Sequence, residues 1–273
     1  MAGALLGQGR VLLVGCGNMG GAMLAGWLAG GMDADRFTVA DPYLAEAPAG
    51  VTLLREVPAG DTFDVVLLGF KPQQIAEAAA PVGAAVGPQT LVLSILAGVD
   101  LATLRGRFPQ ARAIVRVMPN LAAALGKSPI GLFGDGDNTV RPLVDSLMAP
   151  LGTAEWLSDE ALMDVVTALA GSGPAFIYRM IDALATGAAA LGLPRDQADR
   201  LALGMVEGAG ALAAASPLAP GELADRVASP GGTTRAGLDV LDADGRLFAL
   251  IAETLRAARD RGVAMAAEAR AKG

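Results

Sequence analysis

Glycine residues near the start of the chain have the spacing needed to bind a phosphate group. Gly15, Gly17 and Gly20 fit the pattern G-x-G-x-x-G between an apolar run and a segment of helical periodicity. The pattern provides a tight turn, a close approach of the backbone to a pyrophosphate and close packing of the following helix. The order of strand, glycine loop and helix therefore predicts a dinucleotide site, and we expect Asn18 and Met19 in the loop to contact the ligand.

A second candidate anion site is the stretch SPGGTT at residues 229–234, which lies between two segments of helical periodicity. Successive backbone N–H groups in a glycine-rich turn at a helix start form an anion-binding concavity, and two hydroxyl groups add donors. Two glycines between a proline and two threonines exceed what an ordinary turn between helices requires. We expect an anionic group to bind there, at Ser229, Gly231, Gly232, Thr233 and Thr234.

Two charged residues bear on the choice of dinucleotide. Asp41 ends the second apolar run, 21 residues after Gly20. A carboxylate at that position accepts hydrogen bonds from an adenosine ribose and repels a 2′-phosphate, which favours NADH. Arg55, in the next loop, is either a ligand for a 2′-phosphate or a solvated surface charge. The sequence leaves both NADH and NADPH open.

Polar residues also follow the later apolar runs, where ligands bind in doubly wound folds. Lys71, one of only three lysines, suits a coenzyme contact and is alternatively a solvated charge. Asn120 has an amide that could bridge coenzyme and substrate, or it forms a turn. We assign Phe70, Pro72 and Ala97 to the coenzyme site as well.

The composition narrows the classes of function. With 273 residues, 53% hydrophobic and 18% charged, the chain is globular and long enough for two domains. A net charge of −7 argues against nucleic acid or an anionic membrane as a partner and favours a small molecule. There is no histidine and one cysteine, Cys16, which excludes a disulfide, a zinc cage, a Cys/His dyad and a Ser-His-Asp triad. We expect no metal, and Cys16 to be a small filler residue.

The uncharged stretch 11–32 is long enough to be mistaken for a membrane span. It contains seven glycines and Asn18, which break its apolar pattern. We therefore expect a soluble, cytoplasmic chain.

Apolar runs at 11–14, 37–41, 64–70, 90–98 and 111–120 alternate with helical segments. Continuous apolar strands are typical of a parallel sheet covered on both faces, so we predict an α/β, doubly wound domain over residues 1–157.

After Trp156 the pattern is helical, with Ser158 as the expected N-cap and Pro174 as the expected site of a kink. We predict an all-helical domain over residues 158–273 that buries its surplus apolar face in a homodimer at least, with a ring of dimers left open.

Four motifs occur in order along the chain: GFKPQ at 69–73, RVMPN at 116–120, GSGPAFIY at 171–178 and SPGGTT. Together they resemble pyrroline-5-carboxylate reductase, from about residue 10 to at least residue 260. The resemblance implies a Rossmann-type domain, a helical dimerisation and substrate-binding domain, and reduction of the cyclic imine 1-pyrroline-5-carboxylate to L-proline by NAD(P)H. It also implies that SPGGTT receives the substrate carboxylate. For this reaction we expect Thr234 and Asn120 to be the catalytic residues. Members often carry a serine or another small polar residue where Asp41 stands, and most prefer NADPH. The resemblance thus favours NADPH, whereas the carboxylate of Asp41 favours NADH.

Other readings share the glycine loop and a helical second domain. An imine reductase is one, and a β-hydroxyacid dehydrogenase is another, but the latter uses a lysine on its long helix, and no lysine lies between residues 128 and 271. A non-catalytic dinucleotide sensor is a third alternative, against which the intact SPGGTT loop argues.

Overall fold

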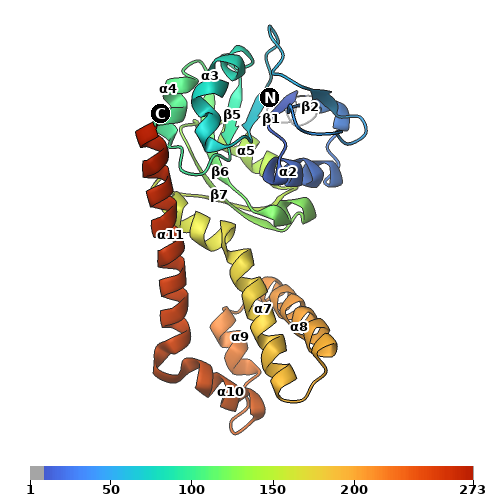
Figure 1. Ribbon diagram of the computed structural model, residues 1–273, viewed down its shortest axis with the longest axis vertical. Coiled ribbons are helices and arrows are strands. Elements are labelled where there is room, and N and C mark those ends of the chain that lie inside the picture. Colours follow the sequence, from blue (N-terminus) through green and yellow to red (C-terminus); the bar gives the residue numbers. More distant parts are fainter. Residues whose placement is uncertain (1–8, 273) are drawn as a thin grey trace. The chain divides into compact units, whose positions relative to one another are not determined.

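The N-terminal part of the chain forms one eight-stranded sheet (Figure 1). The computed structural model describes residues 9–272, with side chains up to residue 267. The strands are β1 (Val11–Val14), β2 (Phe37–Ala40), β3 (Thr52–Leu54), β4 (Val65–Leu68), β5 (Leu91–Ser94), β6 (Ala113–Met118), β7 (Ser128–Gly134) and β8 (Gly152–Trp156). Their order is β3-β2-β1-β4-β5-β6-β7-β8, and every neighbouring pair is parallel except β6 with β7. The predicted doubly wound sheet is confirmed, with one antiparallel pair.

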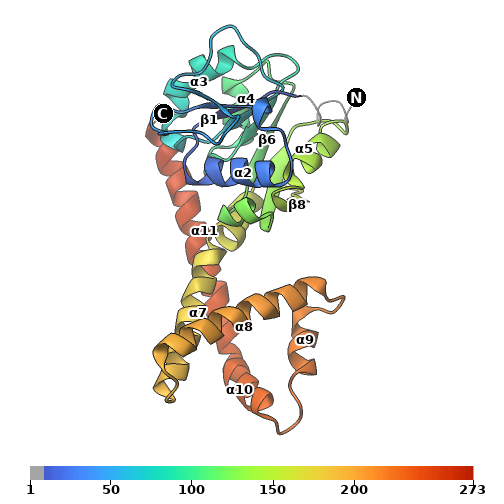
Figure 2. The same ribbon diagram turned by 90° about the vertical axis from the view of Figure 1, so that its right-hand side faces the viewer.

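Helices cover both faces of this sheet (Figures 1 and 2). In β1, Leu13 belongs to a buried cluster that includes Trp27 of α2 (Asn18–Ala29) and Leu147 of α5 (Arg141–Met148). Leu12 belongs to a second cluster with residues of α3 (Ile75–Ala84) and α4 (Leu101–Arg107). Alternate residues of a strand point to opposite faces, so a strand between two helical layers needs apolar residues throughout.

Three of the eight strands were not predicted from the sequence. β3 has only three residues, which is too short for a recognisable apolar run. β7 contains Pro129, Gly131 and Gly134, residue types that lower strand propensity. β8 alternates intermediate and exposed residues because it lies at the edge of the sheet. These strands are fixed by pairing with their neighbours rather than by local preference.

The segment after β8 differs from the prediction at its start. Ser158 is not a helix N-cap, because α6 spans Leu162–Val166. The preceding residues form a turn in which Asp159 Oδ1 accepts a hydrogen bond from the backbone N–H of Ala161 at 2.9 Å. Such local bonds from an aspartate compete with helix formation. A π-helical turn, Thr167–Gly171, follows α6.

Pro174 lies in the first turn of α7 (Gly173–Ala190). The missing N–H of a proline is tolerated there, because the first N–H groups of a helix have no partner within the helix. The predicted interruption at GSGP is therefore real, but it separates two helices rather than kinking one.

The chain divides into two compact units, one comprising the residues up to Gly171 together with the chain from Ala258 onward, and the other comprising Ser172–Ala257. The sheet-bearing unit thus includes α6 and the end of α11. Whether the folding domains are 1–157 and 158–273 stays a prediction. The short helical turns are η1 (Ala34–Arg36), η2 (Pro72–Gln74), η3 (Leu121–Leu125) and η5 (Ala243–Gly245).

The second unit is built only of helices, as predicted. They are α7, α8 (Arg195–Ala215), α9 (Pro220–Arg226), α10 (Thr233–Asp242) and the first part of α11 (Arg246–Lys272). Its buried hydrophobic cluster consists of Ala185, Ala198 and Ala202. Larger apolar side chains are exposed, among them Leu201, Leu203 and Leu212, at 62%, 57% and 72%.

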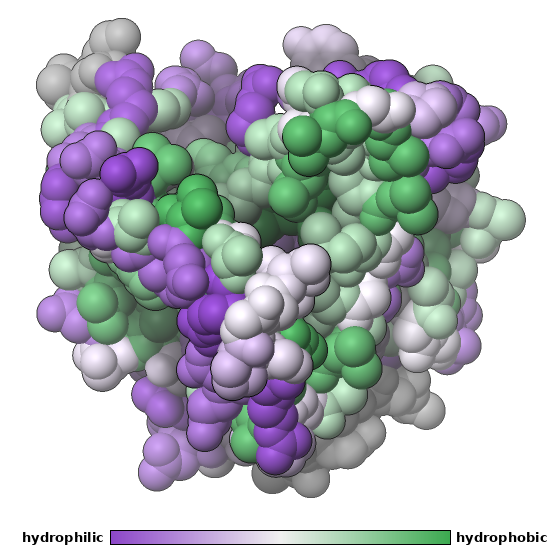
Figure 3. All heavy atoms as spheres, turned by 90° about the horizontal axis from the view of Figure 1, so that it is seen from below, coloured by the Kyte–Doolittle hydropathy of each residue, from purple (hydrophilic) through white to green (hydrophobic). Residues whose placement is uncertain are grey.

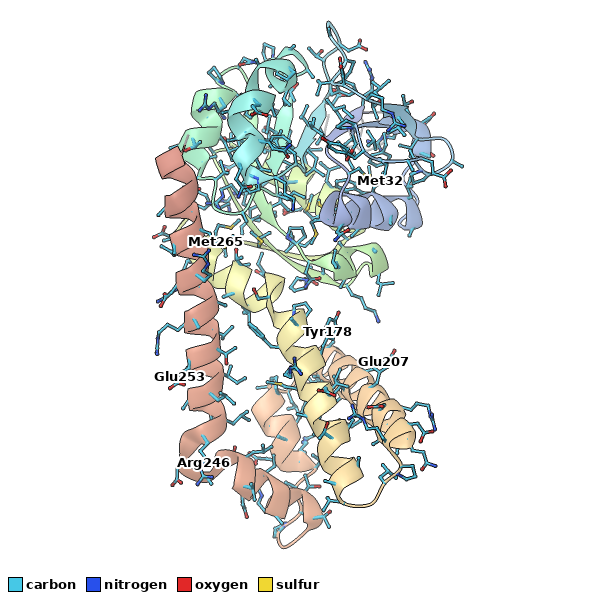
Figure 4. The ribbon with its side chains drawn as sticks, in the orientation of Figure 1. Met32, Tyr178, Glu207, Arg246, Glu253 and Met265 are labelled. Carbon is cyan, nitrogen blue, oxygen red and sulfur yellow. The ribbon has the colours of Figure 1, made fainter. Side chains whose placement is uncertain are left out.

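Hydrophobic residues are accordingly visible at the surface when the molecule is viewed from below (Figure 3). The side chains of α7 and α11, such as Tyr178 and Glu253, extend outward from their helices (Figure 4). In the described part of the chain no single helix has the length and apolar composition to cross a membrane; α8 and α9 meet that criterion only when joined across a bend of 116°.

Candidate functional site

A crevice of about 810 Å³ lies at the carboxyl ends of β1, β2 and β4. In doubly wound sheets ligands bind at this edge, where the strand order reverses. The reversal here falls at β1, which has β2 on one side and β4 on the other. The crevice is lined by Val14, Gly15, Gly17, Asn18, Met19, Ala40, Asp41, Pro42, Tyr43, Gly69, Phe70, Lys71, Gln74, Glu77, Ala78 and Ile95.

The three predicted glycines have distinct structural roles. Gly15 has a φ of +84°, and a Cβ there would lie 2.8 Å from the backbone nitrogen of Phe70. A Cβ on Gly20 would lie 2.8 Å from the carbonyl oxygen of Gly15, so both positions require glycine for packing. A Cβ on Gly17 would meet nothing within 4 Å, which leaves open space at the start of α2. Helix N-termini favour phosphate, and this geometry fits a dinucleotide.

Asp41 is 9% exposed, and its carboxylate is bound to the backbone of the loops that follow β1 and β2. Oδ2 accepts a hydrogen bond from Cys16 N–H at 2.7 Å. Oδ1 accepts bonds from the N–H groups of Tyr43 at 2.8 Å and Leu44 at 3.1 Å. Burial alone would raise the pKa of Asp41, but these three bonds and the charge of Arg55 hold that pKa below its usual value. Asp41 therefore carries a fixed negative charge at neutral pH.

Arg55 contacts the loop that follows β2. Its Nη1 donates hydrogen bonds to the carbonyl oxygens of Leu44 at 2.5 Å and Asp41 at 3.4 Å. Arg55, Pro72 and Ala97 are not among the residues that line the crevice. Gly20 packs beneath the glycine loop rather than lining it.

Lys71, by contrast, is exposed and lines the crevice. Its backbone N–H donates to Gln74 Oε1 at 3.0 Å. Gln74 and Glu77 also line the crevice, as does Tyr43, and the sequence did not identify them. The one available signal was their position just after two strands that were predicted correctly.

Asn120 is 6% exposed, and both ends of its amide bind within the protein. Nδ2 donates to the carbonyl oxygen of Ala170 in the π-helical turn at 2.9 Å. Oδ1 accepts from the N–H of Ala122 at 2.9 Å, and the backbone N–H of Asn120 donates to Ser128 Oγ at 2.9 Å. The residue thus joins the end of β6 to η3, to β7 and to the turn before α7.

A partly buried ion pair that the sequence did not indicate joins β6 to the segment before α6. Arg116 Nη1 contacts Glu160 Oε1 at 2.7 Å, with 7% of the arginine side chain exposed. Glu160 Oε1 also accepts from the N–H of Leu101 at 2.7 Å. The pair fixes the segment before α6 to β6 and to the start of α4.

Cys16 is buried, and burial together with the charge of Asp41 raises the pKa of its thiol. A neutral thiol supports the view of Cys16 as a filler residue. Among the described residues, no group of His, Cys, Asp and Glu side chains is arranged to hold a metal ion.

The SPGGTT stretch lies in the helical unit and forms a tight turn ahead of α10. The N–H of Gly232 donates to the carbonyl oxygen of Ser229 at 2.9 Å. Pro230 precedes Gly231, whose φ is +72°, and this combination is typical of a type II turn. Thr233 and Thr234 open α10 and are exposed.

No side chain caps the N-terminus of α10. The first N–H groups of a helix have no partner within it, so here they are available to an anion together with the two threonine hydroxyls. Arg235 pairs with Asp225 at 2.7 Å.

Comparison with known proteins identifies the family to which the chain belongs. Residues 160–265 match a family model described as pyrroline-5-carboxylate reductase dimerisation, and residues 10–98 match one described as NADP oxidoreductase, coenzyme F420-dependent. The pyrroline-5-carboxylate reductase of Pseudomonas aeruginosa is 35% identical over 266 residues, covering 94% of this chain and 97% of the relative. The chain belongs to the pyrroline-5-carboxylate reductase family. The reductase of Methanosarcina acetivorans is 33% identical, covering 91% of this chain and 95% of its own.

Solved structures of pyrroline-5-carboxylate reductases have the same fold. The enzyme from Coxiella burnetii superimposes with a TM-score of 0.86 at 30% identity, covering 93% of this chain and 97% of its own. The enzyme from Plasmodium falciparum, solved with NADP bound, gives a TM-score of 0.81 at 22% identity, covering 96% of this chain and 99% of its own. The resemblance drawn from four motifs is therefore confirmed along nearly the whole chain.

Proposed function

We propose that this chain reduces 1-pyrroline-5-carboxylate to L-proline with NADH or NADPH. The observation that carries the proposal is the exposed SPGGTT turn at the start of α10, in a reductase-family chain that also has a dinucleotide crevice. The substrate is a small cyclic imine with one carboxylate. In this proposal one unit would supply the site for the coenzyme and the other the site for the substrate carboxylate.

The coenzyme, when bound, supplies a hydride. The chain's residues bind and orient the two reactants. Gly15, Gly17, Asn18 and Met19 would hold the pyrophosphate at the start of α2, with Lys71 as an additional cation. In this proposal Asp41 would lie beside the adenosine ribose, where its negative charge would repel a 2′-phosphate and favour NADH. Arg55 is bonded to loop carbonyls, which makes it a weaker candidate for a phosphate ligand.

The substrate carboxylate would bind the N–H groups at the start of α10 and the hydroxyls of Thr233 and Thr234. The hydride adds to the imine carbon, and the ring nitrogen must carry a proton. A basic imine is protonated by solvent before it binds, so a histidine is dispensable, and the chain has none. Thr234 would orient the substrate as a hydrogen-bond donor rather than act as a strong acid. Catalysis then comes mainly from holding the reacting atoms close together.

Asn120 has a different proposed role from Thr234. Its amide is used within the protein, so we assign it to positioning the π-helical turn rather than to direct contact with the reactants.

We also propose that the helical unit mediates at least a homodimer. Its buried cluster consists of three alanines, whereas leucines of α8 are exposed. Apolar faces of this extent are typical of subunit interfaces. The exposed apolar faces of the helical unit leave a larger ring of dimers open. Light scattering at micromolar concentration distinguishes monomer, dimer and ring.

The activity is tested by incubating the protein with 1-pyrroline-5-carboxylate and NADH or NADPH. Coenzyme absorbance should fall while proline forms in equal amount. Oxidation of a β-hydroxyacid by NAD(P), without imine reduction, would identify a hydroxyacid dehydrogenase. Reduction of simple cyclic imines at the same rate as the carboxylate substrate would identify a general imine reductase. Coenzyme binding with no turnover of any of these would indicate a sensor.

A further inference from the structure

Tyr43 presents an aromatic ring at the edge of the coenzyme crevice. The residue lines the crevice and is 90% exposed. Among the exposed large hydrophobic residues within 9–171, it alone is aromatic. A ring so exposed gains almost nothing from packing within its own chain, so its contribution to folding is small.

The backbone that carries this ring is nevertheless tightly held. Asp41 Oδ1 accepts hydrogen bonds from the N–H groups of Tyr43 and Leu44, at 2.8 and 3.1 Å. The carbonyl oxygen of Leu44 accepts a bond from Arg55 at 2.5 Å. Pro42, between Asp41 and Tyr43, restricts the turn further. The ring therefore extends from a preorganised turn, and little backbone entropy would be lost on binding.

The position of this turn indicates its ligand. Asp41, Pro42 and Tyr43 follow β2, whereas the glycine loop that fits the pyrophosphate follows β1. In doubly wound dinucleotide sites, the adenosine half of the coenzyme lies beyond the end of the second strand. Adenine is flat and uncharged, and aromatic side chains bind such bases by stacking.

We propose that Tyr43 is an adenine-binding residue, whose ring stacks on the base of the coenzyme, and that Asp41 is the positioning residue that holds it there. The proposal rests on the proposed function only in requiring that the crevice takes an adenine dinucleotide. The crevice is also lined by Gln74 of η2 and Glu77 of α3, and both are exposed.

Calorimetry on the full chain tests the assignment with two fragments of the coenzyme. ADP-ribose contains the adenine, and reduced nicotinamide mononucleotide lacks it. Tyr43→Ala should weaken ADP-ribose binding by about 5- to 100-fold, because stacking on one aromatic ring is lost. Tyr43→Phe is the matched control and should stay within about twofold of wild type, since it keeps the ring. The mononucleotide should bind all three proteins equally.

A second measurement does not depend on affinity. In the NMR spectrum of the wild-type complex, the adenine H2 and H8 protons should show nuclear Overhauser effects to the ring protons of Tyr43. Their absence, or ADP-ribose binding that is unchanged in Tyr43→Ala, would overturn the assignment. An equal loss of mononucleotide binding would also overturn it, because the crevice as a whole would then be damaged.

The same titrations separate this inference from the proposed function. Wild-type protein that binds NADH but not ADP-ribose would contradict the adenine site and leave the reductase proposal standing. Wild-type protein that binds neither would contradict both. Turnover of 1-pyrroline-5-carboxylate together with unchanged ADP-ribose binding in Tyr43→Ala would contradict the adenine site alone.

Discussion

The carboxylate of Asp41 and the backbone N–H of Cys16 are joined by a hydrogen bond of 2.7 Å. Cys16 lies in the glycine loop after β1, and Asp41 follows β2, so the bond ties together two loops of the coenzyme crevice. The other oxygen of the same carboxylate holds the turn that carries Tyr43. A single side chain thus organises this edge of the sheet and also gives it a negative charge.

Replacing Asp41 by asparagine should destabilise the fold. An amide presents one oxygen and one NH2 group, so in either orientation at least one backbone N–H loses its acceptor. A buried donor left unpaired costs about 1–3 kcal/mol of the free energy of unfolding. Urea unfolding at pH 7 measures this difference, and Asp61→Asn, at an exposed ion pair, is the matched control and should change little.

The free energies of unfolding of wild type and Asp41→Asn should become more alike in acid. The pKa of Asp41 is lowered in the folded state, so its stabilisation is present above the unfolded pKa of about 3.9 and is lost as the pH falls through the folded value. Wild type should therefore lose more of its stability below about pH 4 than Asp41→Asn does. A difference that stays constant down to pH 2 would show that the charge of Asp41 contributes nothing.

Replacing Asp41 by serine should change the preference between coenzymes. The substitution removes a charge that repels the 2′-phosphate of NADPH, and it also removes a potential ribose acceptor. The ratio of kcat/KM for NADPH to that for NADH should rise about 10- to 1000-fold. Both coenzymes must be compared at one ionic strength, because salt screens the effect. If wild type already prefers NADPH strongly, Asp41 does not face the ribose phosphate.

The glycine loop allows packing and binding to be separated by mutation. Gly17→Ala should fold normally, because the added methyl group meets no atom within 4 Å, yet it should weaken coenzyme binding at least about tenfold by blocking the pyrophosphate. Gly15→Ala should instead lower the free energy of unfolding by about 1–3 kcal/mol, since φ there is +84°. Thermal unfolding and coenzyme titration of both variants check this. Equal losses of stability and of coenzyme affinity in the two variants would contradict separate roles for Gly15 in packing and Gly17 in binding.

The sequence predicted the centre of the fold better than its edge. β1 and β4 are continuous apolar runs, and β5 is apolar up to Ser94, because both faces of these strands are buried, and the sequence predicted all three. β7 and β8 were missed, since Pro129 and two glycines weaken the first and an exposed face interrupts the apolar pattern of the second. Pairing across the sheet, which no local pattern records, fixes both strands.

A similar limit applies to the site. The G-x-G-x-x-G spacing and the position of Asp41 were sufficient to predict a crevice that contains Gly15, Gly17 and Asp41. The bond from Cys16 to Asp41 was not predictable, because it depends on the register of β1 against β2. The presence of Tyr43 and Glu77 in the crevice depends on the same three-dimensional arrangement.

Removing the amide of Asn120 should lower the free energy of unfolding, and any loss of activity should follow from that loss of stability. Asn120→Ala leaves the carbonyl of Ala170 and the N–H of Ala122 without their partners in a buried region. The free energy of unfolding should fall by about 2–4 kcal/mol. Asn138→Ala, at an exposed position, is the control. Unchanged stability together with a large loss of kcat would mean that Asn120 contacts the reactants directly.

Removing the hydroxyl of Thr234 should impair use of the substrate and spare the coenzyme. Thr234 is exposed at the start of α10, and its hydroxyl is proposed to donate to the substrate. Loss of one or two hydrogen bonds to a charged group should reduce transition-state stabilisation by about 1.5–3 kcal/mol. This corresponds to a kcat/KM for 1-pyrroline-5-carboxylate that is about 10- to 150-fold lower. The dissociation constant for the coenzyme should stay within about twofold of the wild-type value, because its crevice lies in the other unit.

Thr234→Ser should recover most of the activity, since it keeps the hydroxyl. Thr254→Ala, at a threonine whose hydroxyl bonds to Leu250 within α11, controls for the loss of a threonine elsewhere in the helical unit. A kcat/KM for Thr234→Ala equal to that of wild type would exclude the Thr234 hydroxyl from substrate binding, because Thr234→Ala removes that donor and leaves the N–H groups at the start of α10 in place.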